Sequence, residues 1–92
     1  MPEMTFTVRW PDGELMRCYS PSLVVQEHLQ VGTSYPVADL VLATRTALGV
    51  ASDRVQSRYG VPCPLAQAQI TAIEQAARRF GADELTVVEE FA

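Results

Sequence analysis

The sequence contains no lysine, one histidine, two cysteines and no apolar run of membrane-spanning length. Its 92 residues carry a net charge of −4, and all seven basic residues are arginines. Binding to a phosphate backbone depends on clustered positive charge, so we expect no nucleic-acid partner. A transmembrane helix needs roughly 20 consecutive apolar residues, so we expect no membrane partner either.

The sequence also has no P-loop, no GxGxxG stretch and no catalytically spaced carboxylate pair within one predicted element. Nucleotide binding and hydrolase chemistry therefore have no support. Cys18, Cys63 and His28 are of types that bind soft metals, but they lack CxxC or HxxxH spacing. We predict no metal and no cofactor. The start MPEMTFTVRW has an early glutamate and no apolar core, so we expect no signal peptide, a cytoplasmic location and reduced thiols.

The N-terminal residues carry the pattern of a β-hairpin. Apolar side chains alternate with polar ones over residues 4–10, which predicts a strand with one buried face. The following 11-PDG-13 is typical of a tight turn, and residues 14–20 form the returning strand. Alternation alone does not decide which face of that second strand is buried.

Helix signals fill the middle of the chain. Ser20 before Pro21 predicts a serine-capped helix from Pro21 to about Gln30. A second helix is expected over residues 33–49, capped by Ser34 or Tyr35. Two glycine-terminated helices follow. The third covers residues 52–60, and the fourth runs from about residue 63 to a stop at Gly81.

Residues 85–91 again favour a strand, which we place beside the N-terminal strand. The predicted fold is one α+β domain over residues 1–92. Its small antiparallel sheet, made of the N-terminal hairpin and the C-terminal strand, has three or four helices packed on one face. The two open edges of such a sheet allow a homo-oligomer.

Cys63 is the best candidate for chemistry. A thiol at a helix N-terminus lies at the positive end of the helix dipole, and unpaired backbone N–H groups can stabilise a thiolate there. His28 could complete a Cys–His pair. The simpler interpretation treats Cys63 as a small buried residue and His28 as a partly exposed helix residue.

Residues 47–60 also resemble the turn and second helix of a helix-turn-helix, with Gly49 in the turn. Arg45 stands where that motif expects a small residue, and the domain is acidic. Two ordinary helices joined at a glycine are the alternative.

The whole chain resembles a small bacterial protein family named for a nitrogen starvation response. The resemblance rests on 1-MPEMTFTVRWPDG-13, 17-RCYSPSLVV-25, 35-YPVADLV-41, 51-ASDRVQSRYG-60 and Cys63. Such families are encoded in clusters with a nitrilase, a radical-SAM enzyme and other enzymes associated with nitrile or cyanide use. The resemblance implies a role in that pathway and no particular reaction.

We therefore predict a small cytosolic accessory protein that has no chemistry of its own and binds an enzyme or small metabolite of that pathway. The expected protein partner is an enzyme of the nitrilase-type cluster. Arginine and tyrosine are favoured at interfaces, so we predict a contact surface of Arg45, Arg54, Arg58 and Tyr59. A minor enzyme or thiol-dependent carrier using Cys63, and a helix-turn-helix DNA-binding regulator, are the alternatives.

Overall fold

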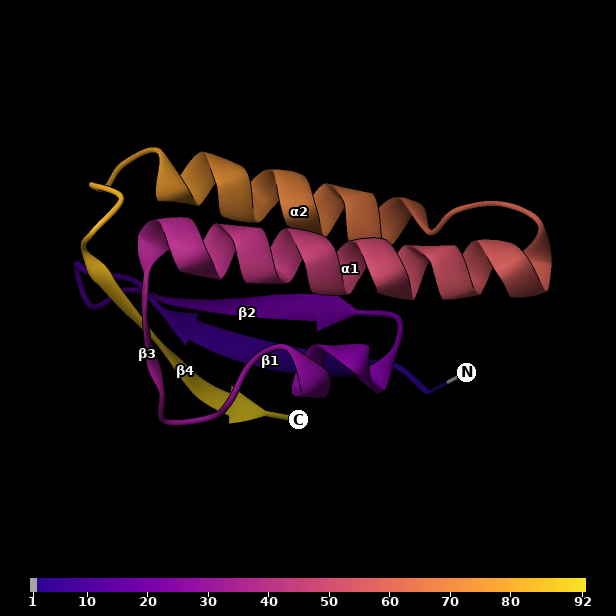
Figure 1. Ribbon diagram of the computed structural model, residues 1–92, viewed down its shortest axis with the longest axis horizontal. Coiled ribbons are helices and arrows are strands. Elements are labelled where there is room, and N and C mark those ends of the chain that lie inside the picture. Colours follow the sequence, from indigo (N-terminus) through magenta and orange to yellow (C-terminus); the bar gives the residue numbers. More distant parts are fainter. Residues whose placement is uncertain (1) are drawn as a thin grey trace.

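The computed structural model describes residues 2–92, which form a helical hairpin packed on a four-stranded antiparallel sheet (Figure 1). In chain order the elements are β1 (Met4–Arg9), β2 (Leu15–Ser20), the 3-10 helix η1 (Leu23–Glu27), β3 (Ser34–Pro36), α1 (Val37–Tyr59), α2 (Pro64–Ala77) and β4 (Leu85–Phe91). The predicted α+β class is correct. The predicted number of helices is wrong, because the described chain has two α-helices and one short 3-10 helix.

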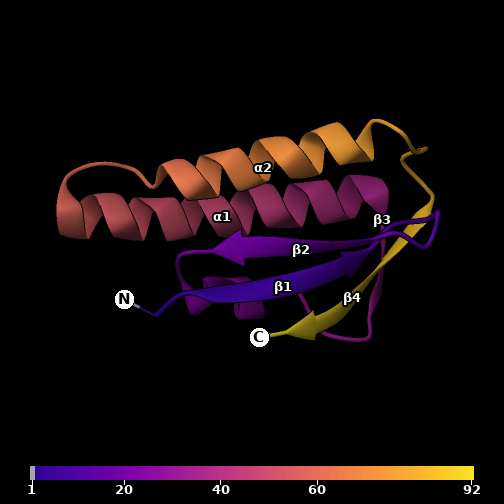
Figure 2. The ribbon, with the colours of Figure 1, turned by 180° about the vertical axis from the view of Figure 1, so that it is seen from behind.

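The N-terminal hairpin forms as predicted and settles which face of β2 is buried. Phe6 lies opposite Cys18 and Val8 opposite Met16, so these side chains point toward the helices. Phe6, Val8 and Cys18 are among the fully buried residues of the core. The opposite face of the sheet has no helix over it (Figure 2).

The C-terminal strand pairs antiparallel with β1, as predicted, and gives the sheet order β2-β1-β4-β3. The register shifts between Thr7 and Val8, where the pairing of β4 passes over Glu89. This extra residue bends the strand. The Nε of Arg9 donates to Oε1 of Glu89 at 2.6 Å, which fixes the displaced side chain on the uncovered face.

β3 is a fourth strand that the sequence did not predict. Ser34 and Tyr35, expected as helix caps, instead pair with Val87 and Thr86 of β4. The strand is only three residues long and ends in Pro36, so it shows no alternation. Proline lacks an N–H and is tolerated here because β3 is an edge strand.

The helices predicted over residues 33–49 and 52–60 are one continuous helix, α1. Gly49 does not end it, because the buried stripe of Thr44, Ala47, Leu48 and Ala51 passes through that position. Burial of a continuous apolar face outweighs the cost of glycine within a helix, about 1 kcal/mol relative to alanine. The helix stops at Gly60, whose φ of 86° is left-handed.

The helix expected over residues 21–30 is shorter and tighter than predicted. Ser22, not Ser20, is the N-cap of η1 and accepts a hydrogen bond from the Val24 N–H. Ser20 is buried at the end of β2, where its hydroxyl donates to the Ser22 carbonyl. Val24 and Val25 are both buried, so η1 places them in the core.

The remaining helix, α2, begins where it was predicted but ends at Ala77 and not at the predicted stop, Gly81. Cys63 is the N-cap and Pro64 takes the first turn. Ala66 and Ile73 are buried and Ile70 packs against the core.

Of residues 2–92, no helix is long and apolar enough to cross a membrane. The molecule measures 38 × 22 × 17 Å, and α1 spans most of the long axis, so its C-terminal end projects past the strands (Figures 1 and 2).

Candidate functional site

Cys63 lies at the start of α2, as predicted, and is 9% exposed. Its backbone N–H donates to the Ser52 hydroxyl at 3.2 Å and ties α2 to α1. Within residues 2–92 no hydrogen bond engages its thiol. His28 is the exposed C-cap residue of η1, and its backbone N–H donates to the Val25 carbonyl. No hydrogen bond joins His28 to Cys63 within residues 2–92, and the Cys–His pair stays a prediction.

The two cysteines are free thiols, and both are buried. Burial raises the pKa of Cys18 from 9.0 to about 12, because a thiolate is poorly solvated between the sheet and the helices. Across residues 2–92, no three histidine, cysteine or acidic residues gather as a metal cluster would require. The fold thus uses Cys18 as a core residue.

The predicted arginine surface does not form one patch. Each residue of an α-helix is rotated by about 100° from the one before it. Over the nine residues from Arg45 to Arg54 the rotation leaves the two side chains about 180° apart, so they face opposite sides of α1. Arg45 pairs with Glu74 of α2. Arg54 donates to the Ser22 hydroxyl at 3.2 Å, beside η1. The two arginines were assigned to one surface because arginine is favoured at interfaces, and their placement in separate helices left their relative directions open.

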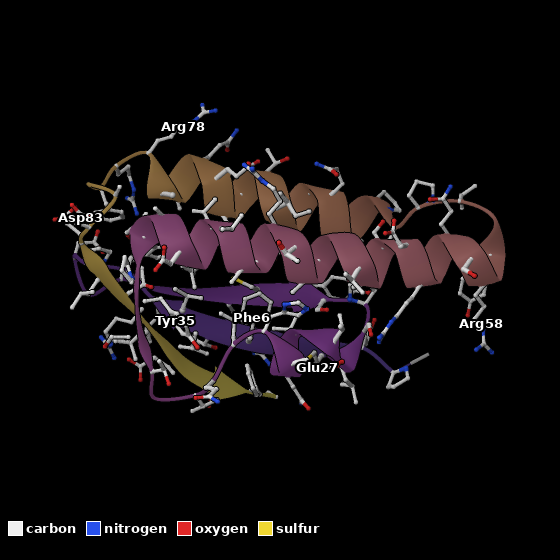
Figure 3. All side chains as sticks on the ribbon, in the orientation of Figure 1. Phe6, Glu27, Tyr35, Arg58, Arg78 and Asp83 are labelled. Atoms are coloured by element: carbon white, nitrogen blue, oxygen red, sulfur yellow. The ribbon has the colours of Figure 1, made fainter. Side chains whose placement is uncertain are left out.

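The other half of that surface lies at the end of the helical hairpin. We call residues 58–65 the hairpin tip. The Arg58 guanidinium lies 5.8 Å from the centre of the Tyr59 ring, and Figure 3 shows Arg58 pointing away from the body of the molecule. Tyr59, Val61 and Leu65 are 61%, 63% and 60% exposed. The tip therefore offers an aromatic ring, two aliphatic side chains and a cation to solvent.

Sequence reasoning missed Val61 and Leu65. Val61 precedes Pro62 and Leu65 follows Pro64. Nothing in their spacing indicates that they are exposed. Val61 and Leu65 are exposed because they lie at the turn of a projecting helical hairpin. The hairpin projects only because α1 is one continuous helix.

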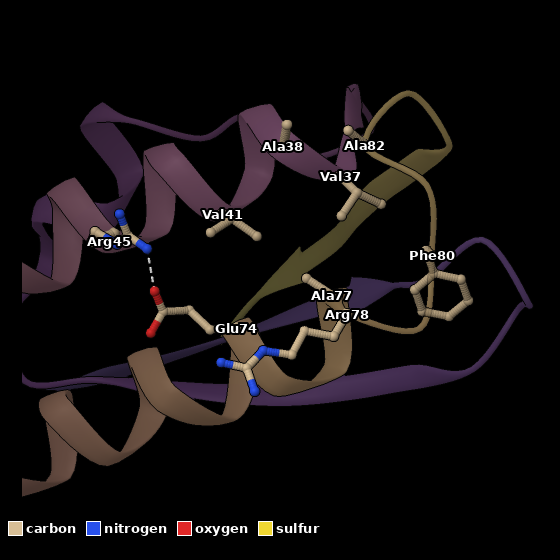
Figure 4. Close-up of a pocket in the computed structure, with 9 residues that line it drawn as sticks. All are labelled: Val37, Ala38, Val41, Arg45, Glu74, Ala77, Arg78, Phe80 and Ala82. Carbon is tan, nitrogen blue, oxygen red and sulfur yellow. Dashed lines mark hydrogen bonds and ion pairs between the residues drawn. The ribbon is translucent and has the colours of Figure 1, made fainter.

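A second candidate is an open groove between α1 and α2 near the opposite end of the hairpin (Figure 4). We call it the helix groove. Its volume is about 470 Å³, and it is lined by Val37, Ala38, Val41, Arg45, Glu74, Ala77, Arg78, Phe80 and Ala82. Glu74 stands four residues before Arg78 on α2, a spacing that favours an ion pair along the helix. It pairs with Arg45 across the groove instead.

The uncovered face of the sheet holds one perturbed group. Burial and a hydrogen bond from its hydroxyl to the Glu3 carboxylate, 3.1 Å away, raise the pKa of Tyr19 to about 12. Tyr19 therefore stays neutral across the physiological range.

The helix-turn-helix interpretation is wrong, because it needs a turn at Gly49 and that residue lies inside α1. The resemblance came from a glycine, a small polar residue and a valine at helix-turn-helix spacing. Those residues lie on one continuous helix here. The DNA-binding alternative loses the observation on which it depended.

Fold and surface together define a small two-layer α+β domain with an exposed helical hairpin. The chain belongs to the family described as nitrogen starvation-induced protein NitG, whose model matches residues 5–91. The sequence resemblance to a nitrogen-starvation family is thereby confirmed. No curated protein and no solved structure matches the chain.

Proposed function

We propose that this chain is a small accessory protein that binds an enzyme of nitrile or cyanide assimilation during nitrogen starvation, without chemistry of its own. Family membership supports the link to nitrogen starvation. The hairpin tip supports the binding role and is the observation that carries the proposal. The nitrile pathway and the nitrilase-type cluster come from the sequence resemblance.

The composition of the tip is that of an interaction surface. Interface hot spots are enriched in tyrosine and arginine, which the tip supplies as Tyr59 and Arg58. Val61 and Leu65 add apolar area at more than half exposure. Exposed apolar side chains at one projecting end are costly in water unless a partner covers them. The partner surface should be an apolar pocket with an acidic rim that accepts Arg58.

Self-association through the sheet edges stays a prediction. On the β2 edge, the Tyr19 N–H donates to the Gln69 side chain at 2.9 Å, so α2 occupies part of that edge. On the other edge β3 is short and ends in proline. Both features oppose edge-to-edge pairing. Native mass spectrometry of the purified protein measures the oligomeric state directly.

A tagged pull-down from nitrogen-starved cells tests the proposed function. We expect a nitrilase, or an enzyme encoded beside it, to be recovered in a defined ratio to the bait. The bait from nitrogen-replete cells is the control for abundant proteins that bind any column. Recovery of none of these enzymes under starvation would count against the accessory role.

A thiol-dependent activity of Cys63 is the second candidate, favoured by its position at the N-terminus of α2. If Cys63 is the reactive thiol, iodoacetamide should label it well before the deeply buried Cys18. Mass spectrometry of timed alkylation at pH 6.5 separates the two thiols. Equally slow labelling of both would remove this candidate.

A further inference from the structure

The helix groove exists because small side chains leave space between two helices, and most of its lining residues are apolar. Ala38 of α1, Ala77 of α2 and Ala82 of the following loop line it, and Val41 and Phe80 add larger apolar surfaces (Figure 4). Phe80 in turn stacks on Trp10, with ring centres 5.8 Å apart and planes 10° apart. The lining therefore connects directly to the buried core.

The charged lining of the groove leaves one cation without an acceptor. Arg45 and Glu74 neutralise each other across the groove. Arg78 enters no ion pair and donates no side-chain hydrogen bond within residues 2–92. Its neighbour Arg79, by contrast, lies 3.5 Å from the Glu14 carboxylate. With two arginines and one glutamate, the groove carries a charge of +1 in a chain of net charge −4.

We propose that the helix groove binds a small organic monocarboxylate, with its apolar body against Val41, Ala77 and Phe80 and its carboxylate on Arg78. A guanidinium matches a carboxylate in a two-bond, charge-assisted arrangement. The groove's net charge of +1 matches the single negative charge of a monocarboxylate. The volume of about 470 Å³ lies within the range typical of small-molecule sites. This site goes beyond the proposed function, since the hairpin tip lies at the other end of α1.

The test uses 3-phenylpropanoate as the probe and 3-phenylpropanamide as its neutral counterpart, both titrated into the full chain. Trp10 is the only tryptophan, and its stacking on Phe80 makes its fluorescence a reporter for the groove. Amide chemical shifts of Ala38, Ala77 and Phe80 locate the probe independently. We expect saturable binding of the carboxylate, about tenfold or more tighter than binding of the amide.

Three variants distinguish a site from a surface effect. Arg78→Gln should weaken carboxylate binding by about tenfold or more, because the charge-assisted pair is lost. Ala38→Phe, at an exposed position, should fill the groove and weaken both probes. Arg17→Gln removes another exposed arginine, on β2 and outside the groove, and should change binding less than about twofold. Circular dichroism confirms that each variant is folded.

The proposal is overturned by any of three results with folded protein. The first is no saturable binding of the carboxylate up to millimolar concentration. The second is equal affinity for the carboxylate and the amide. The third is an Arg78→Gln variant that binds the carboxylate as tightly as the wild type does. None of these results bears on partner capture by the tip, so the two proposals fail separately.

Discussion

Cys18 and Tyr19 are neighbours in β2 that face opposite sides of the sheet, and burial is the first cause of the raised pKa of each. The Cys18 thiol is 1% exposed, and burial alone raises its pKa to about 12. For Tyr19, the Glu3 carboxylate adds to burial as a cause. Each side chain is therefore protonated in the folded state at pH values where the unfolded chain begins to ionise.

This linkage predicts alkaline destabilisation. An unfolded Cys18 releases its proton near pH 9, whereas the folded protein holds it until about pH 12. The unfolded state binds fewer protons in this window, so the free energy of unfolding falls as pH rises above 9. The slope is at most about 1.4 kcal/mol per pH unit for one proton. The stability that Cys18 contributes is complete below pH 9.

Urea unfolding at pH 8, 9 and 10 measures the slope. Cys18→Ala should be less stable at pH 8, because it leaves a cavity, and its stability should depend less on pH. Val8→Ala is the matched control, since it leaves a cavity in the core without removing a titratable group, so its stability should keep the wild-type dependence on pH. An unchanged slope in Cys18→Ala would show that another group causes the effect.

At the scale of elements, α1 determines where every candidate surface lies. A single helix puts Arg45 and Arg54 on opposite sides and carries Tyr59 beyond the sheet. Two shorter helices would have allowed those arginines to meet. Both Gly49 and Gly60 satisfy the sequence rule for a helix end, but only Gly60 has a positive φ.

Substituting the two glycines by alanine tests the continuity of α1. No atom lies within 4 Å of a Cβ added at either position. Gly49→Ala should stabilise the protein by about 0.5–1 kcal/mol, because alanine favours a helix interior. Gly60→Ala should destabilise it by roughly 1–2 kcal/mol, the cost of a left-handed conformation for a residue with a Cβ. Thermal and urea unfolding measure both, and destabilisation by Gly49→Ala would contradict a continuous helix.

Regular patterns were predictable from the sequence, and exceptions to them were not. The alternation in β1 predicted the hairpin, and the apolar stripe of α2 predicted that helix. The residue types of 85–91 predicted the last strand. β3 is too short to show a pattern. The continuity of α1 through Gly49 could have been predicted, since the buried stripe from Leu40 to Ala51 keeps helical spacing across the glycine. A local stop signal was given more weight than that longer-range pattern.

The candidate surfaces were less predictable because they depend on contacts between elements. Arg58 and Tyr59 were selected from sequence and lie at the hairpin tip. The spacing of four residues on α2 favours a pair of Arg78 with Glu74, but Glu74 is also within reach of Arg45 on the neighbouring helix. Spacing along one helix could not reveal that competition. The helix groove exists only where two helices and a loop meet.

On the scale of the whole molecule, the two proposed binding regions lie at opposite ends of the helical hairpin. The tip is exposed and apolar with one cation, whereas the helix groove at the other end is an open, apolar concavity with a cation at its wall. The uncovered sheet face carries the Arg9–Glu89 pair and Tyr19. A protein of net charge −4 thus presents cations at both proposed contact regions.

The central claim is that the hairpin tip binds a partner enzyme, and a comparison of three baits in the starvation pull-down tests it most directly. The baits are the wild type, a Tyr59→Ser with Leu65→Ser variant, and Leu42→Ser. Leu42 is 62% exposed on α1 outside the tip, so it matches Leu65 in chemistry and exposure. We predict that the tip variant loses about tenfold or more of the captured enzyme, as expected for loss of a hot spot, and that Leu42→Ser retains it. Equal capture by all three folded baits would contradict the account.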